Sequence, residues 1–233
     1  MVVALLTAAG VGSRMGLDIP KQFYHVENKP LIIYTLEAFE KHPSIDAIVC
    51  VTLPNWIDVL KAYAAQYKIG KLRWIVPGGA TGQESIHNGL MAIKENIPED
   101  DVTVMIHDGN RCLVSAEIIS NSIAVYKKHG SAVTAIPCVE AAFLSEDGLS
   151  SDATIPREKL YRTQTPHTYD LSKLLWAHEE AGKRGISNTA ATCTLMQALG
   201  ETVYFSRGAE KNLKITTAED LELFQLLLHT GNK

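Results

Sequence analysis

Near its start the chain carries Leu5-Leu6-Thr7-Ala8-Ala9-Gly10-Val11-Gly12-Ser13-Arg14-Met15-Gly16, an apolar strand pattern that runs into a glycine-rich turn. Small residues let backbone N–H groups approach phosphates, because no Cβ stands in the way. Arg14 and, after Pro20, Lys21 supply positive charge that offsets a triphosphate. The stretch therefore predicts a nucleotide site that acts on phosphates rather than one that transfers a hydride.

Two better-known nucleotide motifs differ from this turn. The dinucleotide fingerprint G-x-G-x-x-G needs a third glycine where this chain has Met15. The P-loop pattern G-x-x-x-x-G-K-[ST] is absent from the sequence. On these residues alone, an ordinary strand-to-helix turn with a surface arginine and lysine remains the alternative.

The composition limits the class of protein. Of the 233 residues, 46% are hydrophobic and 21% are charged, as in globular proteins. The net charge of −4 argues against a nucleic-acid partner, because the basic field that binds a polyphosphate backbone is missing. No apolar run approaches the roughly 18 residues that span a bilayer, and no signal-peptide pattern precedes the first strand, so we expect no membrane partner. Four widely spaced cysteines disfavour a zinc site or a disulfide framework and indicate a cytoplasmic location: Cys50, Cys112, Cys138 and Cys193.

Apolar strand patterns alternate with helical patterns along the chain. Pro30 precedes a helix over Leu31–Lys41, Ser115 caps a helix that stops at Gly130, and Thr217 with Asp220 starts a helix over Ala218–His229. The alternation predicts a doubly wound, Rossmann-like, mainly parallel α/β sheet in a single domain over residues 1–233. The expected strands are Val2–Thr7, Ala47–Thr52, Leu72–Val76, Val102–His107, Ala132–Pro137 and Thr202–Ser206.

The stretch from Cys138 to about Pro166 interrupts this alternation. Its apolar segments flank the turn residues Glu146-Asp147-Gly148, which predicts an extended hairpin that leaves the main sheet. Such a β-arm cannot bury its own apolar side chains, so a homodimer through the arm is one hypothesis. A solvated insertion loop is the other.

Three loops follow strands at the edge of the sheet where ligands bind in this fold class. Asp108 follows the strand Val102–His107, where a carboxylate beside a polyphosphate most simply holds Mg²⁺ or else caps its loop. The loop that carries Gly79 leads to Ser85. The Ser85 hydroxyl and the nearby N–H groups would bind a nucleobase or sugar. The alternative is an ordinary loop followed by a helix cap. Lys214, before the last helix, offers a third phosphate-neutralising cation or a solvated one.

Taken together, these motifs resemble the cytidylyltransferase family that contains 2-C-methyl-D-erythritol 4-phosphate cytidylyltransferase and ribitol-5-phosphate cytidylyltransferase. The resemblance extends over nearly the whole chain, with its blocks in the family's order, and implies the nucleotidyltransferase type of fold. The blocks are the Ala8–Met15 turn, Pro20-Lys21-Gln22, Asn28-Lys29-Pro30, Gly78-Gly79, Ser85, His107-Asp108, Arg111, Thr163-Gln164-Thr165-Pro166 and Asn212-Leu213-Lys214-Ile215-Thr216.

The resemblance implies a role for each site residue. Arg14, Lys21 and Lys214 would form the catalytic set, the first two on the triphosphate, and Asp108 would bind Mg²⁺. Arg111, Glu140, Arg157 and Lys214 would serve the acceptor, with Arg157 reaching the partner's site in a homodimer. The nucleotide set would comprise Ala8, Ala9, Gly10, Gly12, Gly79, Ser85, Asp108 and Gly109. The implied reaction joins CTP and a polyol phosphate, and releases pyrophosphate.

Departures from the family pattern gather around the acceptor. Gly109-Asn110 replaces a pair of alanines and Cys112 replaces a proline, while Ala141 and the stretch Asn188–Ala191 lack an expected hydroxyl and an expected acid. Lys211 stands where a second metal carboxylate is common, and Glu210 beside it is a possible substitute. The acceptor therefore stays open between methylerythritol phosphate and an alditol phosphate such as ribitol 5-phosphate. A sugar-1-phosphate nucleotidyltransferase and a nucleotide-binding module that has lost turnover are the rival functions.

Overall fold

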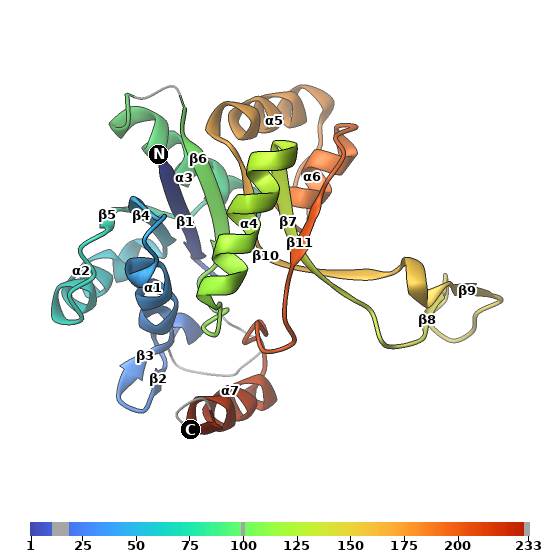
Figure 1. The fold of residues 1–233 in the computed structure, drawn as a ribbon, viewed down its shortest axis with the longest axis horizontal. Helices are drawn as coiled ribbons and strands as arrows, with labels where there is room; N and C mark the ends of the chain where they lie inside the picture. Colours follow the sequence, from blue (N-terminus) through green and yellow to red (C-terminus); the bar gives the residue numbers. More distant parts are fainter. Residues whose placement is uncertain (11–18, 99–100, 231–233) are drawn as a thin grey trace.

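In the computed structural model, which describes residues 1–10, 19–98 and 101–230, seven strands form one central sheet (Figure 1). The strand order is β11-β7-β10-β6-β1-β4-β5, and every neighbouring pair is parallel except the two pairs that β10 makes with β6 and β7. The α/β fold with a mainly parallel sheet is thus confirmed. The strands are β1 (Val2–Ala8), β4 (Ala47–Thr52), β5 (Leu72–Pro77), β6 (Thr103–Asp108), β7 (Ser131–Pro137), β10 (Tyr161–Asp170) and β11 (Phe205–Arg207).

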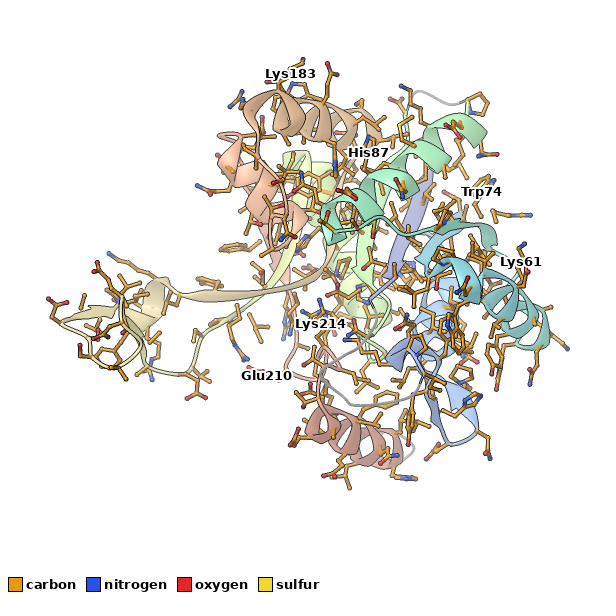
Figure 2. The ribbon with its side chains drawn as sticks, turned by 180° about the vertical axis from the view of Figure 1, so that it is seen from behind. Lys61, Trp74, His87, Lys183, Glu210 and Lys214 are labelled. Carbon is orange, nitrogen blue, oxygen red and sulfur yellow. The ribbon has the colours of Figure 1, made fainter. Side chains whose placement is uncertain are left out.

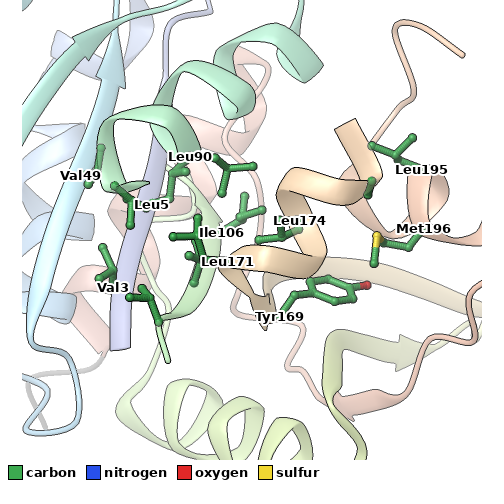
Figure 3. Close-up of a cluster of buried hydrophobic side chains, with 14 of the residues drawn as sticks. Val3, Leu5, Val49, Leu90, Ile106, Tyr169, Leu171, Leu174, Leu195 and Met196 are labelled. Carbon is green, nitrogen blue, oxygen red and sulfur yellow. The ribbon is translucent and has the colours of Figure 1, made fainter. Parts of the chain in front are cut away.

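Helices cover both faces of this sheet and bury it, which explains the continuous apolar strands. Alternate residues of β1 face opposite ways: Val3 and Leu5 pack with α3, α5 and α6 (Figure 3), whereas Ala4 and Leu6 pack with α1, α2 and α4. All four of these side chains are fully buried. The helices are α1 (Leu31–Lys41), α2 (Ile57–Gln66), α3 (Gly82–Asn96), α4 (Ala116–His129), α5 (Leu171–Arg184), α6 (Thr192–Ala198) and α7 (Ala218–Thr230).

The predicted helix ends are confirmed by hydrogen bonds. Ser115 Oγ accepts the N–H of Ile118 at 3.3 Å, and Gly130 ends α4 with a left-handed φ of 76°. At the start of α7, Thr217 Oγ1 accepts the N–H of Asp220, while Asp220 Oδ2 accepts the N–H of Thr217 at 2.9 Å. These caps pair backbone groups that the ends of a helix leave without partners.

Strand β10 corrects the expected boundary of the arm at Pro166. Tyr161 already pairs with Pro137 of β7, so the stretch from Tyr161 to Pro166 belongs to the central sheet. The polar sequence and the proline hid this strand, because both are unusual inside a sheet. The last strand also differs from its expected bounds of Thr202–Ser206, because β11 covers Phe205–Arg207.

The arm itself projects from the body, as Figure 1 shows. Its two short strands, β8 (Ala142–Leu144) and β9 (Ala153–Ile155), pair antiparallel and carry exposed apolar side chains. Phe143 is 64% exposed and Leu149 is 92% exposed. The short elements that remain are η2 (Lys21–Phe23), β2 (His25–Val26), β3 (Lys29–Pro30), η3 (Pro54–Trp56) and η4 (Arg157–Lys159). Among the described helices, none combines the length and apolar character needed to cross a membrane.

Candidate nucleotide and phosphate site

A cavity of about 740 Å³ opens at the carboxyl ends of the parallel strands. Ala8 ends β1 and Asp108 ends β6 in adjacent register, so loops from distant parts of the sequence meet there. The cavity brings together nine of the predicted site residues: Ala8, Ala9, Gly10, Lys21, Gly79, Ser85, Asp108, Arg111 and Lys214.

The other predicted site residues have different positions. Gly12 and Arg14 lie outside the described residues. Gly109 does not line the cavity: its N–H donates to Thr7 O at 2.8 Å, and an added Cβ would stand 2.8 Å from Ile32 Cδ1. Glu140 and Arg157 belong to the arm, and Arg157 Nη1 donates to Val139 O at 3.3 Å. The roles implied for these residues remain predictions.

A loop on the wall of the cavity is closed by the buried hydroxyl of Ser85. Ser85 Oγ accepts the N–H of Gly79 at 3.1 Å and donates to Thr81 O at 2.8 Å. Thr81 in turn caps α3, because its Oγ1 accepts the N–H of Glu84. A Cβ on Gly78 would lie 2.4 Å from Ala9 Cβ, so only glycine lets the two loops approach this closely.

The cationic side of the cavity centres on the carboxylate of Asp108. Lys214 Nζ lies 3.1 Å from Oδ1, and Arg111 Nε lies 3.0 Å from Oδ2. Burial raises the pKa of Asp108, but the two cations outweigh it and bring the pKa down to about 2. Asp108 is therefore ionised at neutral pH, with two cations beside it that a phosphate group would also attract.

A buried histidine, His107, is linked to the backbone of Asp108 through the hydroxyl of Thr165. Thr165 Oγ1 accepts the N–H of Asp108 at 2.9 Å and lies 3.0 Å from His107 Nδ1. Arg111 O can only accept, so His107 carries its proton on Nε2 and donates it to that carbonyl at 3.2 Å, which leaves Nδ1 to accept from the Thr165 hydroxyl. Burial lowers the pKa of His107 to about 4, which keeps the ring neutral and this pattern fixed.

Glu210 does not join Asp108 in the cavity. Both of its oxygens accept from Arg162 Nη2, at 2.6 and 2.7 Å, and its side chain is 65% exposed. Figure 2 labels Glu210 and Lys214 in the segment between β11 and α7, yet only Lys214 lines the cavity. Among the described lining residues, Asp108 is the one carboxylate that could hold a metal ion.

Sequence reasoning missed several amides that hold the loops of the site. Gln22 Nε2 donates to Ala8 O at 2.6 Å. Gln83 donates to Ile186 O and accepts the N–H of Thr189, so it ties the start of α3 to the loop before α6. These bonds reach backbone groups 14 to 106 residues away, and no local pattern marks such contacts. Gln22 alone had a signal, since it directly follows Lys21 within a family block.

Comparisons with known proteins show which family this chain resembles over its whole length. The family model for 2-C-methyl-D-erythritol 4-phosphate cytidylyltransferase matches residues 2–230. A ribitol-5-phosphate cytidylyltransferase of Lacticaseibacillus paracasei is 41% identical, with 98% of each chain covered. A 2-C-methyl-D-erythritol 4-phosphate cytidylyltransferase of Clostridium botulinum is 39% identical over 96% of each chain. The solved structure of 4-diphosphocytidyl-2C-methyl-D-erythritol synthase from Anaerococcus prevotii is 25% identical with a TM-score of 0.83, covering 98% of this chain and 96% of that one.

Proposed function

The chain belongs to the 2-C-methyl-D-erythritol 4-phosphate cytidylyltransferase family, and we propose that it transfers the cytidylyl group of CTP to a polyol phosphate. The acceptor is ribitol 5-phosphate or 2-C-methyl-D-erythritol 4-phosphate, each a phosphate monoester on a short hydroxylated chain. One observation carries the proposal: the Gly79–Ser85 loop and the pair Lys214–Asp108 line the same cavity. A nucleotide and a second phosphate can therefore meet there.

The proposed reaction exchanges one phosphorus–oxygen bond for another. A phosphate oxygen of the acceptor bonds to the α-phosphorus of CTP, the bond from that phosphorus to the bridging oxygen breaks, and pyrophosphate leaves. The acceptor phosphate is already an anion, so no general base is needed and catalysis consists of positioning and charge stabilisation. Lys21 and Arg14 would neutralise the triphosphate, while Lys214 and Arg111 would hold the acceptor phosphate beside it.

We propose Mg²⁺ as the cofactor, and the donor set fits that ion. Mg²⁺ in nucleotide sites keeps several waters and takes one or two carboxylates together with the phosphates. Asp108 supplies one ionised carboxylate, 18% exposed, at the wall of the cavity. When bound, the ion would neutralise phosphate charge and orient the triphosphate. Glu210 is held by Arg162, so we assign the metal to Asp108 alone.

We also propose that the protein is a homodimer formed through the arm. Phe143, Leu144 and Leu149 expose more than half of their surface on β8 and the turn beyond it, where they lack a core of their own. A second copy would cover these side chains. In that assembly Arg157 and Glu140, which lie on the same arm, would serve the partner's acceptor site.

A cytoplasmic location completes the proposal. The four cysteines are free thiols, and Cys50, Cys112 and Cys193 are buried. Burial raises the pKa of Cys50 and of Cys112 to about 12, so these thiols stay protonated and unreactive. Unpaired cysteines are typical of a reducing compartment.

A product survey tests the function. The purified protein is incubated with CTP, Mg²⁺ and one acceptor at a time: ribitol 5-phosphate, methylerythritol phosphate or glucose 1-phosphate. Pyrophosphate release and the mass of the CDP product are measured together. We expect a CDP-polyol with one of the first two acceptors. A CDP-sugar from glucose 1-phosphate alone would favour the sugar-1-phosphate class, and CTP binding without pyrophosphate release would favour a module without turnover.

A further inference from the structure

The backbone around Lys214 is held without regular secondary structure. Residues 208–217 lie between β11 and α7 and form neither helix nor strand. Nevertheless, Asn212 is fully buried and Ile215 is 1% exposed, whereas the Lys214 side chain is 43% exposed. Contacts from elsewhere in the chain must therefore fix the backbone from which the Lys214 side chain extends.

Asn212 Nδ2 donates to Gln164 Oε1 and Thr165 O, and two neighbouring residues of the loop after β6 add contacts on each side of Lys214. Arg111 Nη1 donates to Asn212 O at 2.7 Å. Asn110 Nδ2 donates to Ile215 O at 2.5 Å, and the N–H of Ile215 donates to Asn110 O at 3.0 Å. This loop starts directly after Asp108, so these bonds connect the Asp108 carboxylate and Lys214 through a short path.

We propose that Asn110 is a positioning residue for the acceptor: its side-chain amide fixes Lys214 where the ammonium group can bind the phosphate of the polyol. The proposal rests on the proposed function and adds a residue for which the family pattern has alanine. Asn110 is 7% exposed, and its Nδ2 is engaged with Ile215 O. It therefore acts through the backbone next to Lys214.

The chemistry of the contact requires an amide donor. Alanine offers no group to Ile215 O, and the carbonyl then loses a buried partner. Aspartate has nearly the same shape, but its two oxygens cannot donate to a carbonyl when ionised. The flexible Lys214 side chain would in either variant start from a less fixed backbone, and small displacements of a positioning group cost a large part of the rate.

The kinetic test compares Asn110→Ala and Asn110→Asp with the matched control Asn121→Ala. Asn121 also holds a backbone group, since its Oδ1 accepts the N–H of Arg207 at 2.7 Å, but it does not line the cavity. We expect both Asn110 variants to raise KM for the polyol phosphate by about tenfold, with KM for CTP changed less than about twofold. The control should leave both constants unchanged. If the Asn110 variants were merely less well folded, the fraction of active protein would fall, but KM for the polyol phosphate would not rise more than KM for CTP.

A labelling test needs no turnover. The rate at which acetic anhydride modifies Lys214 is measured by mass spectrometry, with Lys173 in the same molecule as the internal reference. We expect Lys214 to react severalfold faster in both Asn110 variants, because the ammonium group would leave Asp108 more often, and to react at the wild-type rate in Asn121→Ala. A direct contact between Asn110 and the substrate would change KM but not this rate.

The outcomes separate the two proposals. A wild-type protein that makes no CDP product from either polyol phosphate contradicts the proposed function, while the labelling still decides the position of Lys214. Wild-type kinetics or wild-type labelling in the Asn110 variants would overturn the positioning role. It would also be overturned if both KM values rose equally, or if neither variant folded, since the contact would then be structural.

Discussion

Lys214 Nζ and Asp108 Oδ1, from residues 106 positions apart in the sequence, lie 3.1 Å apart at the wall of the cavity. Arg111 occupies the other carboxylate oxygen at 3.0 Å. The two cations that we propose for the acceptor phosphate therefore pair with the carboxylate that we propose for the metal. When the substrates and Mg²⁺ bind, Asp108 would pair with the metal ion, and Lys214 and Arg111 would pair with the acceptor phosphate.

Replacing Lys214 should therefore affect catalysis far more than stability. Lys214→Gln should lower turnover by about 100-fold, because a positioned cation beside reacting phosphates is lost. The free energy of unfolding should fall by only about 1 kcal/mol, because Lys214 is 43% exposed and Arg111 still neutralises the Asp108 carboxylate. Steady-state kinetics and urea unfolding measure both. Lys173→Gln, which breaks the Lys173–Glu201 pair away from the cavity, should leave turnover unchanged.

Asp108 should make stability depend on acid pH. Its pKa is about 2 when folded and near 3.8 when unfolded, so the unfolded state takes up the proton first as pH falls. The contribution is full above about pH 4 and is lost as pH falls towards 2, in total about 2 kcal/mol. Urea unfolding at a series of pH values would detect it. Asp108→Asn should show a correspondingly smaller loss, and an equal loss in both proteins would contradict the assignment.

Removing the hydroxyl of Ser85 should weaken CTP binding selectively. In Ser85→Ala the N–H of Gly79 loses its partner, so KM for CTP should rise about tenfold while KM for the polyol phosphate stays unchanged. Ser115→Ala is the matched control, because Ser115 caps α4 away from the cavity. That variant should lose about 1 kcal/mol of stability and keep both KM values. If Ser85→Ala kept the wild-type KM for CTP, the loop would not be the nucleotide site.

Two inactive variants should restore activity to each other if the arm completes the partner's site. Arg157→Ala removes a group that serves the other subunit, and Lys21→Ala disables a subunit's own site. After mixing and exchange at equal amounts, half of the dimers carry one intact site, so about a quarter of wild-type activity should return. Each variant alone should stay inactive. No recovery in a mixture shown to contain mixed dimers would place Arg157 in its own subunit's site or outside both.

The fold was predictable wherever its signals are local. The strand Ala47–Thr52 is buried throughout, and its apolar run predicted its bounds correctly. Ser115 and Gly130 likewise predicted both ends of α4, because caps depend on neighbouring backbone groups. Strand β10 was not predictable in this way. Thr165 and His167 are buried polar residues that line the cavity, so an alternation of apolar side chains could not reveal the strand.

The site was predictable as a set of chemical groups but not as a network. Gly79, Ser85, Asp108 and Lys214 follow strands whose carboxyl ends must share one edge, so their meeting follows from topology. Asn110 gave no such signal: its bond to Ile215 spans 105 residues and depends on the path of a segment without secondary structure. The sequence left open whether Glu210 is a second metal carboxylate, and its ion pair with Arg162 could not be predicted from it.

Cytidylyl transfer itself is tested most directly by following the α-phosphate of CTP. The enzyme is given CTP labelled with ³²P at the α-position, Mg²⁺ and ribitol 5-phosphate or methylerythritol phosphate, and the products are separated. Attack at the α-phosphorus predicts that the label appears in the CDP-polyol and that the pyrophosphate is unlabelled. Label recovered in CDP beside a newly phosphorylated polyol, or label that remains in CTP with both acceptors, would contradict the proposed reaction.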